Sequence, residues 1–205
     1  MPVSPKRVKI HHPIQTQLLV LPPLIQDCQP LPLIDLIAQM IDQILLYNDK
    51  LPTTMSQITR FHSRSIPNIS VGDYLIRFQK YLSLDNSILV IILIFIDRIS
   101  KDPQLPINSL TIHRFILATI TISSKHVSDV YPKNSIFAKI GGITLGELNM
   151  IEMELCKSLN WRLSCPFKLI QNYYINLVLN HPLYTFPCKL TIQPSNSDVY
   201  LDQLN

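Results

Sequence analysis

Glycine and charged residues are both scarce in this chain. Its 205 residues include only 4 glycines, which disfavours turn-rich all-β folds and the glycine loops that cradle phosphates. Charged residues make up 16% of the chain, and the net charge of +4 does not gather in a stripe of lysine and arginine. Because such a stripe is the usual mark of a nucleic-acid surface, we expect no nucleic-acid partner.

Patterns typical of metal sites and enzymes are also missing. The four cysteines (Cys28, Cys156, Cys165 and Cys188) show neither C-x-x-C spacing nor paired histidines of the zinc-ligand type. We find no paired carboxylates, no Ser-His-Asp or Cys-His arrangement and no phosphate loop. The sequence therefore predicts reduced cysteines and no metal, cofactor or catalytic residue.

Long hydrophobic runs are absent as well. The longest, residues 88–96, has nine residues, whereas a membrane-spanning helix needs about 20. The N-terminus is basic and interrupted by prolines, unlike a signal peptide. We therefore expect no membrane partner, and we predict that residues 88–96 are a buried element of the core.

Proline, in contrast, is plentiful, and most of the 16 prolines cluster in residues 2–32 and 182–194. Because proline interrupts helices, these clusters predict a disordered arm over residues 1–30 and a flexible tail over residues 181–205. The residues between them, 31–180, are numerous enough for one domain with a single hydrophobic core.

Within this domain, apolar residues recur at helical spacing. Residues 33–47 are predicted to form an amphipathic helix that leads into the core. Further helices are expected at about 70–82, 86–100, 108–126, 135–139 and 167–179, and the capping-box pattern of Thr144 and Glu147 opens another. The segment 88–96 is apolar on every face, as a central helix must be. The predicted fold class is therefore all-α.

Several separated segments between Arg60 and Leu163 carry a family pattern. They are residues 60–64, 67–70, 74–77, 96–98, 109–115, 124–125, 134, 138–142, 147–149 and 152. In this order they resemble the cyclin box of fungal phosphate-pathway cyclins and the related P/U-type cyclins. The resemblance implies a single cyclin box of five helices, with an N-terminal helix before it and a short C-terminal helix after it.

The resemblance also implies a function. A cyclin of this type is a non-catalytic regulatory subunit that forms a heterodimer with a proline-directed cyclin-dependent protein kinase of the phosphate-signalling type, and activates it. Lys125 and Glu152 match the lysine and glutamate with which cyclins hold the kinase's regulatory helix. The alternative is a lysine and a carboxylate that are merely exposed to solvent.

A third kinase-binding residue implied by the resemblance is Asp129, where phosphate-pathway cyclins also carry an acidic residue. The implied kinase works without a phosphate on its activation segment. The carboxylate of Asp129 can then replace that phosphate as the anion that a kinase arginine binds, since the guanidinium fork matches a carboxylate and a phosphate alike. The alternative is an aspartate that stabilises a turn near Tyr131.

Two motif positions favour a structural role instead. Arg77 and Asp97 match an arginine and an aspartate that pair across two cyclin helices, and Asp97 follows the apolar run 88–96. We therefore predict a structural ion pair at a buried edge. His113 lies on the apolar side of its predicted helix and is interpreted as a core histidine rather than a metal ligand.

Other functions stay open at this point. Helical periodicity alone also fits a cyclin-fold scaffold, a transcription-factor-like binding module, or an inactive remnant that no longer binds a kinase. Near Ile66 and Tyr74 the hydrophobic docking motif of cell-cycle cyclins is missing, so substrate docking through that patch is not expected. Residues 5–9 resemble a nuclear import signal, or form a solvated basic end. We expect the protein in the nucleus and the cytoplasm.

Overall fold

The computed structural model describes residues 18–51, 58–100 and 105–187. Within these ranges it confirms the all-α class. The helices are α1 (Pro30–Asn48), α2 (Val71–Leu82), α3 (Asn86–Ile99), α4 (Ile112–Val127), α5 (Asn134–Gly141), α6 (Leu145–Ser158) and α7 (Phe167–Leu179). A short 3-10 helix, η1 (Ile25–Asp27), and two short strands, β1 (Leu19–Val20) and β2 (Tyr184–Thr185), complete the described elements.

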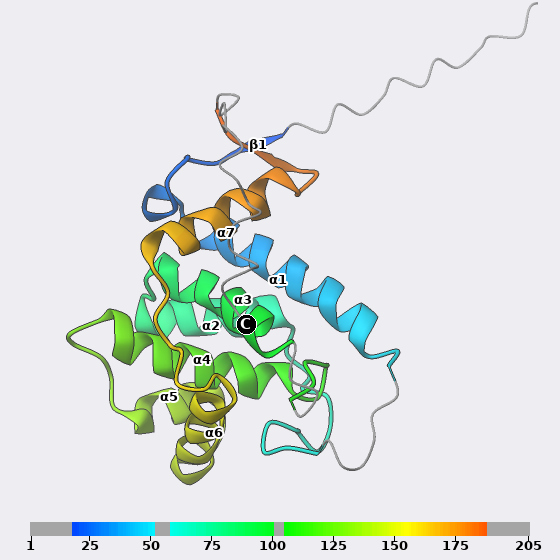
Figure 1. Ribbon diagram of the computed structural model, residues 1–205, viewed down its shortest axis with the longest axis vertical. Helices are drawn as coiled ribbons and strands as arrows, with labels where there is room; N and C mark the ends of the chain where they lie inside the picture. The colour runs from blue at the N-terminus through cyan, green and yellow to red at the C-terminus, as the bar shows by residue number, and fades with distance from the viewer. Residues whose placement is uncertain (1–17, 52–57, 101–104, 188–205) are drawn as a thin grey trace, which may run out of the picture.

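Helix α3 lies in the middle of the fold, between α1 and α7 on one side and α4 on the other (Figure 1). Every residue from Ile88 to Ile96 is buried, as the all-round apolar pattern predicts. Burial of one large aliphatic side chain contributes roughly 1.5–3 kcal/mol relative to exposure. The run 88–96 is therefore the main source of hydrophobic stabilisation at the centre of the domain.

Helix α1 begins earlier than expected, because Pro30 and Pro32 lie inside its first turn. Proline is tolerated there, since the first turn of a helix has no internal partner for its N–H groups. Among the described helices, α1 alone is long and apolar enough to span a membrane by length and composition. Seven of its residues are buried, and the helix packs against α2, α3 and α7 as part of the core.

Side-chain caps start several helices where the sequence predicts them. Ser70 accepts a hydrogen bond from the N–H of Asp73 at the start of α2. At the start of α6, Thr144 and Glu147 form the full capping box, in which each side chain accepts from the other's N–H. A cap of this kind is worth about 1 kcal/mol. These caps define the beginnings of α2 and α6.

Helix α4 begins at Ile112, four residues later than predicted. The preceding residues form a turn in which the Asn108 side chain accepts from the N–H of Leu110, at 3.0 Å. The N–H of Asn108 in turn donates to the hydroxyl of Thr111, at 2.9 Å. Asparagine favours such local side-chain bonds over a helical conformation, which explains the later start.

The predicted disordered arm is wrong for residues 18–30, which pack against the domain. Ile25 is buried, and its N–H donates to Oε1 of Gln171 on α7 at 3.1 Å. The Tyr174 hydroxyl of the same helix donates to the carbonyl of Pro22, at 2.7 Å. Proline prevents a long helix here, but an extended segment can still bury its apolar side chains. Residues 1–17 lie outside the described ranges.

The first part of the predicted flexible tail is also ordered. Strand β2 pairs in parallel with β1, and the N–H of Leu19 donates to the carbonyl of Leu183 at 2.8 Å. Tyr184 and Phe186 are buried against the same end of the domain. The two strands lie side by side beyond α7, at the end opposite α6 (Figure 1). The rest of the tail, residues 188–205, is outside the described ranges.

Candidate functional site

The structure brings Lys125 and Glu152 into direct contact. Lys125 Nζ lies 2.5 Å from Oε1 of Glu152, across the seam between α4 and α6. The other carboxylate oxygen of Glu152 accepts from the Asn134 side chain at 2.8 Å. The same Asn134 amide also donates to Oδ1 of Asn149, at 2.8 Å. Side chains of α4 and α5 therefore hold Glu152 of α6 in one orientation.

The hydrophobic pattern explains why this pair lies at a seam. In α4, every residue from Ile116 to Ser124 is buried, and Lys125 is the first side chain to emerge. In α6, the buried stripe contains Leu148, Ile151 and Leu155. Glu152 follows Ile151 directly, so it lies at the edge of this stripe rather than in the middle of it.

Because the Lys125–Glu152 pair is partly buried, it contributes more free energy than an ordinary surface ion pair. The side chains of Lys125 and Glu152 are 30% and 18% exposed. Exposed pairs contribute about 0–1 kcal/mol, whereas removing one partner of a buried pair leaves an uncompensated charge. The pair is nevertheless open enough on one side to be reached by a partner. It is a preorganised donor and acceptor at the surface.

Apolar side chains are exposed on the same segments as this pair. Val127 lies two residues after Lys125, Met153 directly follows Glu152, and Ile136 of α5 faces a cleft between α5 and α2; they are 43–48% exposed. Tyr131, after α4, is exposed to a similar degree. These helices therefore offer apolar as well as charged groups to a partner.

Trp161 is a candidate site residue that the sequence analysis missed. It follows the end of α6, is 61% exposed, and has a φ of +59° directly after Asn160, at +49°. Positive φ values are uncommon for residues other than glycine and often occur at functional positions. Exposed tryptophans are also frequent binding hot spots. The signal available in the sequence was that this is the chain's only tryptophan.

Asp129 lies two residues past the end of α4 and is exposed. It forms none of the ion pairs found among the described residues, which are Arg60–Glu154, Arg114–Glu147 and Lys125–Glu152. Its location just past the end of the helix is the one predicted. Its role as an anion for the kinase stays a prediction.

The predicted ion pair between Arg77 and Asp97 is wrong. Both residues are exposed, and Asp97 accepts a hydrogen bond from the hydroxyl of Tyr173 on α7. Arg77 instead lines a cleft between α2 and α5 together with Tyr81. A helix turns by about 100° per residue, so a side chain that follows a buried run can face solvent. Asp97 lies in the last turn of α3, on the side of α7.

His113 lies in the core, in agreement with its interpretation. It is buried, and its Nε2 donates to the carbonyl of Ile69 at 2.9 Å. Burial lowers the pKa of His113, and this effect outweighs the opposing contributions of the Ile69 hydrogen bond and of Asp42. Nowhere in the described ranges do three or more His, Cys, Asp or Glu side chains gather as a candidate metal site.

The described cysteines are free. Cys28 and Cys156 are buried, and Cys165 is half-buried. Burial raises the pKa of each of these thiols, and the nearby Glu152 carboxylate raises that of Cys156 further. Cys156 is therefore a packing residue of α6 rather than a reactive thiolate.

Comparison with known proteins places these residues in a family. The family model described as Cyclin matches residues 35–163, which is more than half of the chain. The chain belongs to the cyclin family. The match covers Lys125, Glu152 and Asp129, together with helices α2 to α6.

The relatives of this cyclin confirm the expected branch of the family. It is 35% identical over 149 residues to PHO85 cyclin PHO80 of Saccharomyces cerevisiae, covering 70% of this chain and 51% of that protein. It is 34% identical over 191 residues to the Nuc-1 negative regulatory protein preg of Neurospora crassa, covering 91% of this chain and 38% of that protein. It is 29% identical over 168 residues to Cyclin-U4-1 of Arabidopsis thaliana, covering 80% and 83%. The chain thus spans about half or less of the length of the two fungal relatives.

Proposed function

We propose that this cyclin is the regulatory subunit of a proline-directed cyclin-dependent protein kinase of the phosphate-signalling type, and that it has no catalytic activity of its own. Regulatory subunits of the cyclin family are generally non-catalytic. Two relatives from Saccharomyces cerevisiae are named as cyclins of PHO85, which supports the class of partner. The Neurospora crassa relative is named as a negative regulator of Nuc-1, which supports a regulatory role.

The observation that carries this proposal is the Lys125–Glu152 pair, held on two packed helices that also expose apolar side chains. An amphipathic helix of the kinase can cover exposed apolar side chains of α4 and α6, such as Val127 and Met153, with its apolar face. Lys125 can then donate to backbone carbonyl groups of that helix, and Glu152 can accept from its backbone N–H groups. Because both side chains are already positioned, little side-chain entropy is lost on binding.

Activation follows from which helix is held. The regulatory helix of a protein kinase carries the glutamate that pairs with the catalytic-site lysine. Binding that favours the position in which this pair forms shifts the kinase towards its active conformer. The exposed Asp129 offers a carboxylate to an arginine of the activation segment, in place of a phosphate. The cyclin contributes positioning and charge to the heterodimer.

The test is reconstitution with a purified proline-directed kinase of the phosphate pathway. We expect the full chain to co-purify with the kinase and to increase phosphorylation of a Ser-Pro peptide. The variant Lys125→Ala/Glu152→Ala should lose both properties. The Arg60→Ala/Glu154→Ala variant, which removes the more exposed ion pair between α6 and the segment before α2, should keep them. Absence of binding by the wild-type chain would overturn the proposal. Binding without activation would favour a scaffold.

We also propose that the heterodimer is present in both nucleus and cytoplasm. Residues 5–9 are basic and lie outside the described ranges. We expect them to support nuclear import, so that the protein divides between nucleus and cytoplasm. Deletion of residues 1–10 should then reduce the nuclear signal of a fluorescent fusion without changing kinase binding. An unchanged nuclear signal would remove the import function.

A further inference from the structure

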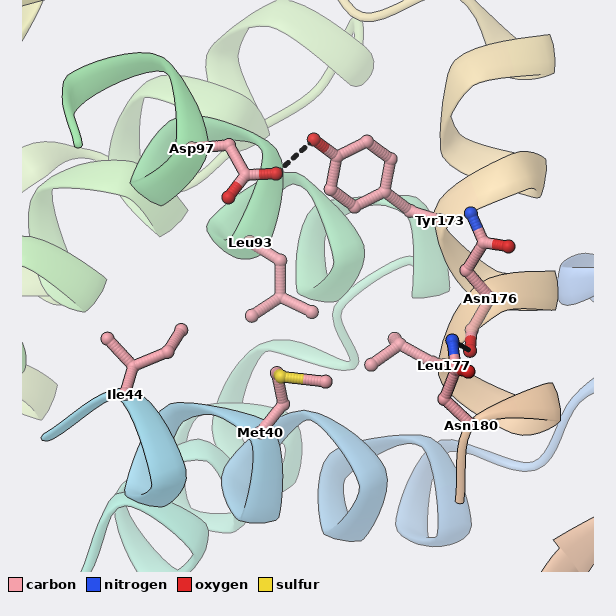
Figure 2. Close-up of a pocket in the computed structure, with 8 residues that line it drawn as sticks. All are labelled: Met40, Ile44, Leu93, Asp97, Tyr173, Asn176, Leu177 and Asn180. Carbon is pink, nitrogen blue, oxygen red and sulfur yellow. Dashed lines mark hydrogen bonds between the residues drawn. The ribbon is translucent and has the colours of Figure 1, made fainter. Parts of the chain in front are cut away.

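A pocket of about 380 Å³ lies between α1, α3 and α7, away from the Lys125–Glu152 pair (Figure 2). Its floor is apolar and consists of Met40 and Ile44 from α1, Leu93 from α3 and Leu177 from α7. Its polar residues are Asp97 and Tyr173, joined by their hydrogen bond, and the carboxamides Asn176 and Asn180. Pockets of about 300–1,000 Å³ with an apolar lining and a few convergent polar groups are typical binding sites.

Asp97 gives this pocket one negative charge. The Tyr173 hydroxyl donates to Oδ2 of Asp97, while Oδ1 accepts no hydrogen bond from any described residue. The neighbouring Arg98 is directed elsewhere, since its guanidinium donates to the carbonyls of Arg162 at 2.5 Å and Ser164 at 2.9 Å. Among the described residues, no cation therefore neutralises the Asp97 carboxylate.

The two asparagines add further acceptors. Asn180 Nδ2 donates to the backbone carbonyl of Asn176 at 2.9 Å, which leaves its own side-chain oxygen free of any bond within the described chain. The side-chain amide of Asn176 makes no hydrogen bond there either, and both asparagines are exposed. Three acceptor groups and a single negative charge thus surround an apolar floor. This arrangement suits a cation that has several donors and an aliphatic stem.

We propose that this pocket binds an arginine side chain presented by a short apolar segment of a partner protein. The guanidinium carries five N–H donors in a planar fork, which can serve Asp97 and the two carboxamides together. The aliphatic stem and an adjacent leucine-like side chain pack on Met40, Ile44, Leu93 and Leu177. Because Asp97, Asn176 and Asn180 are all exposed, an extended segment can lie across the opening while one side chain enters.

This site is separate from the proposed kinase interface. Its residues belong to α1, α3 and α7, whereas the Lys125–Glu152 pair belongs to α4 and α6, on the other side of the fold in Figure 1. A segment bound here therefore does not compete with a helix held by Lys125 and Glu152. The site offers this cyclin a second docking surface, specific for basic and apolar sequence.

The test uses a fluorescein-labelled Gly-Leu-Arg-Leu-Gly amide as the probe, titrated with the full chain in a fluorescence anisotropy measurement. A matched peptide with citrulline in place of arginine keeps the shape but removes the charge. We expect the arginine peptide to bind at least tenfold more tightly than the citrulline peptide. Nα-acetyl-arginine amide, a free cation without the leucines, should compete only weakly.

Two variants locate the binding. Asp97→Asn removes the charge but can still accept from Tyr173, so the fold should be kept, and we expect at least a tenfold loss of affinity. Met40→Lys places a competing ammonium in the pocket and should reduce binding similarly. The control Asp42→Asn changes an exposed carboxylate of α1 that does not line the pocket, and should bind like the wild type.

Equal binding of both peptides would overturn the requirement for a cation. Unchanged affinity in Asp97→Asn and Met40→Lys would show that the peptide does not bind in this pocket. Equal competition by Nα-acetyl-arginine amide would show that the ligand is a small cation rather than a protein segment, and would contradict the proposal in that respect.

Discussion

Glu152 and Asp97 are carboxylates in two family motifs, yet their surroundings differ. Glu152 accepts from Lys125 and Asn134, so both of its oxygens have partners from neighbouring helices. Asp97 is exposed, and within the described part of the chain only one of its oxygens is bonded, to Tyr173. The first carboxylate is held at the seam of packed helices, and the second stands at the rim of an open pocket. A motif therefore conveys which residue is present, while the neighbouring helices determine what that residue can do.

The largest expected difference between the two is in kinase binding. Glu152→Ala should weaken binding by about 2 kcal/mol or more, roughly 30-fold, because it removes a preorganised charged acceptor from the centre of the proposed interface. Asp97→Ala, on the other side of the fold, should leave the affinity unchanged. Isothermal titration of the purified kinase with each variant measures both values. Similar losses in the two variants would contradict the separation of the two regions.

A second expected effect concerns the helix packing that supports Glu152. A Cβ added at Gly141 would lie only 2.4 Å from Cδ2 of the buried Leu117, so α5 and α4 would have to move apart. Overpacking of this kind costs about 1–3 kcal/mol, and we expect Gly141→Ala to lower the melting temperature by several degrees. Gly146→Ala is the matched control, because a Cβ there meets nothing within 4 Å. An unchanged melting temperature for Gly141→Ala would show that the Leu117 side chain can move aside without loss of stability.

The stability of the core between the two regions should depend on pH through His113. Burial lowers its pKa below the ordinary value of 6.5, so the unfolded chain takes up a proton before the folded chain does. The contribution of neutral His113 to stability is therefore complete above pH 6.5 and is lost as the pH falls below that value towards its lowered pKa. Chemical denaturation at pH 7.5 and pH 5.5 should show a decrease that is smaller in His113→Gln. An identical decrease in the variant would mean that other groups account for it.

The smallest expected effect is on the stability of the Asp97 region. Asp97→Ala removes one exposed hydrogen bond, and we expect a cost of less than about 1 kcal/mol. Tyr173→Phe should cost a similar amount, since it deletes the same bond from the other side. The double variant should then cost no more than either single variant, as measured by urea denaturation. A cost of several kcal/mol would indicate that Asp97 is buried and paired after all.

Much of the fold could be predicted because local signals agree with the final packing. The boundaries of α7 are those expected, and the capping box of Thr144 and Glu147 starts α6 as predicted. The run 88–96 is buried on every side, because a helix without a polar face can lie only in the centre. Lys125 and Glu152 were predicted as site residues from family motifs, whereas the contact between them is seen only in the structure.

The remaining features depend on tertiary contacts that no local pattern describes. The direction of Asp97 depends on where Tyr173 arrives, 76 residues later in the chain. The order of residues 18–30 depends on Gln171 and Tyr174, which lie still farther along the sequence. Trp161 was overlooked because its exposure results from the backbone turn after α6, and hydrophobicity alone suggests burial. In each case the missing information was the position of a distant segment.

The short ladder between β1 and β2 has a practical consequence for handling the molecule. Because Leu19 is hydrogen-bonded to Leu183, the described chain enters and leaves the domain at neighbouring points, at the end opposite α6 (Figure 1). An affinity tag, a fluorophore or a surface linker fused at either end of the described domain, before Leu18 or after Pro187, can therefore join it from the same side and leave the α4–α6 seam facing outwards. The same proximity makes the described domain, residues 18–187, a suitable candidate for circular permutation, with a short linker joining these two points and new ends opened in a surface loop.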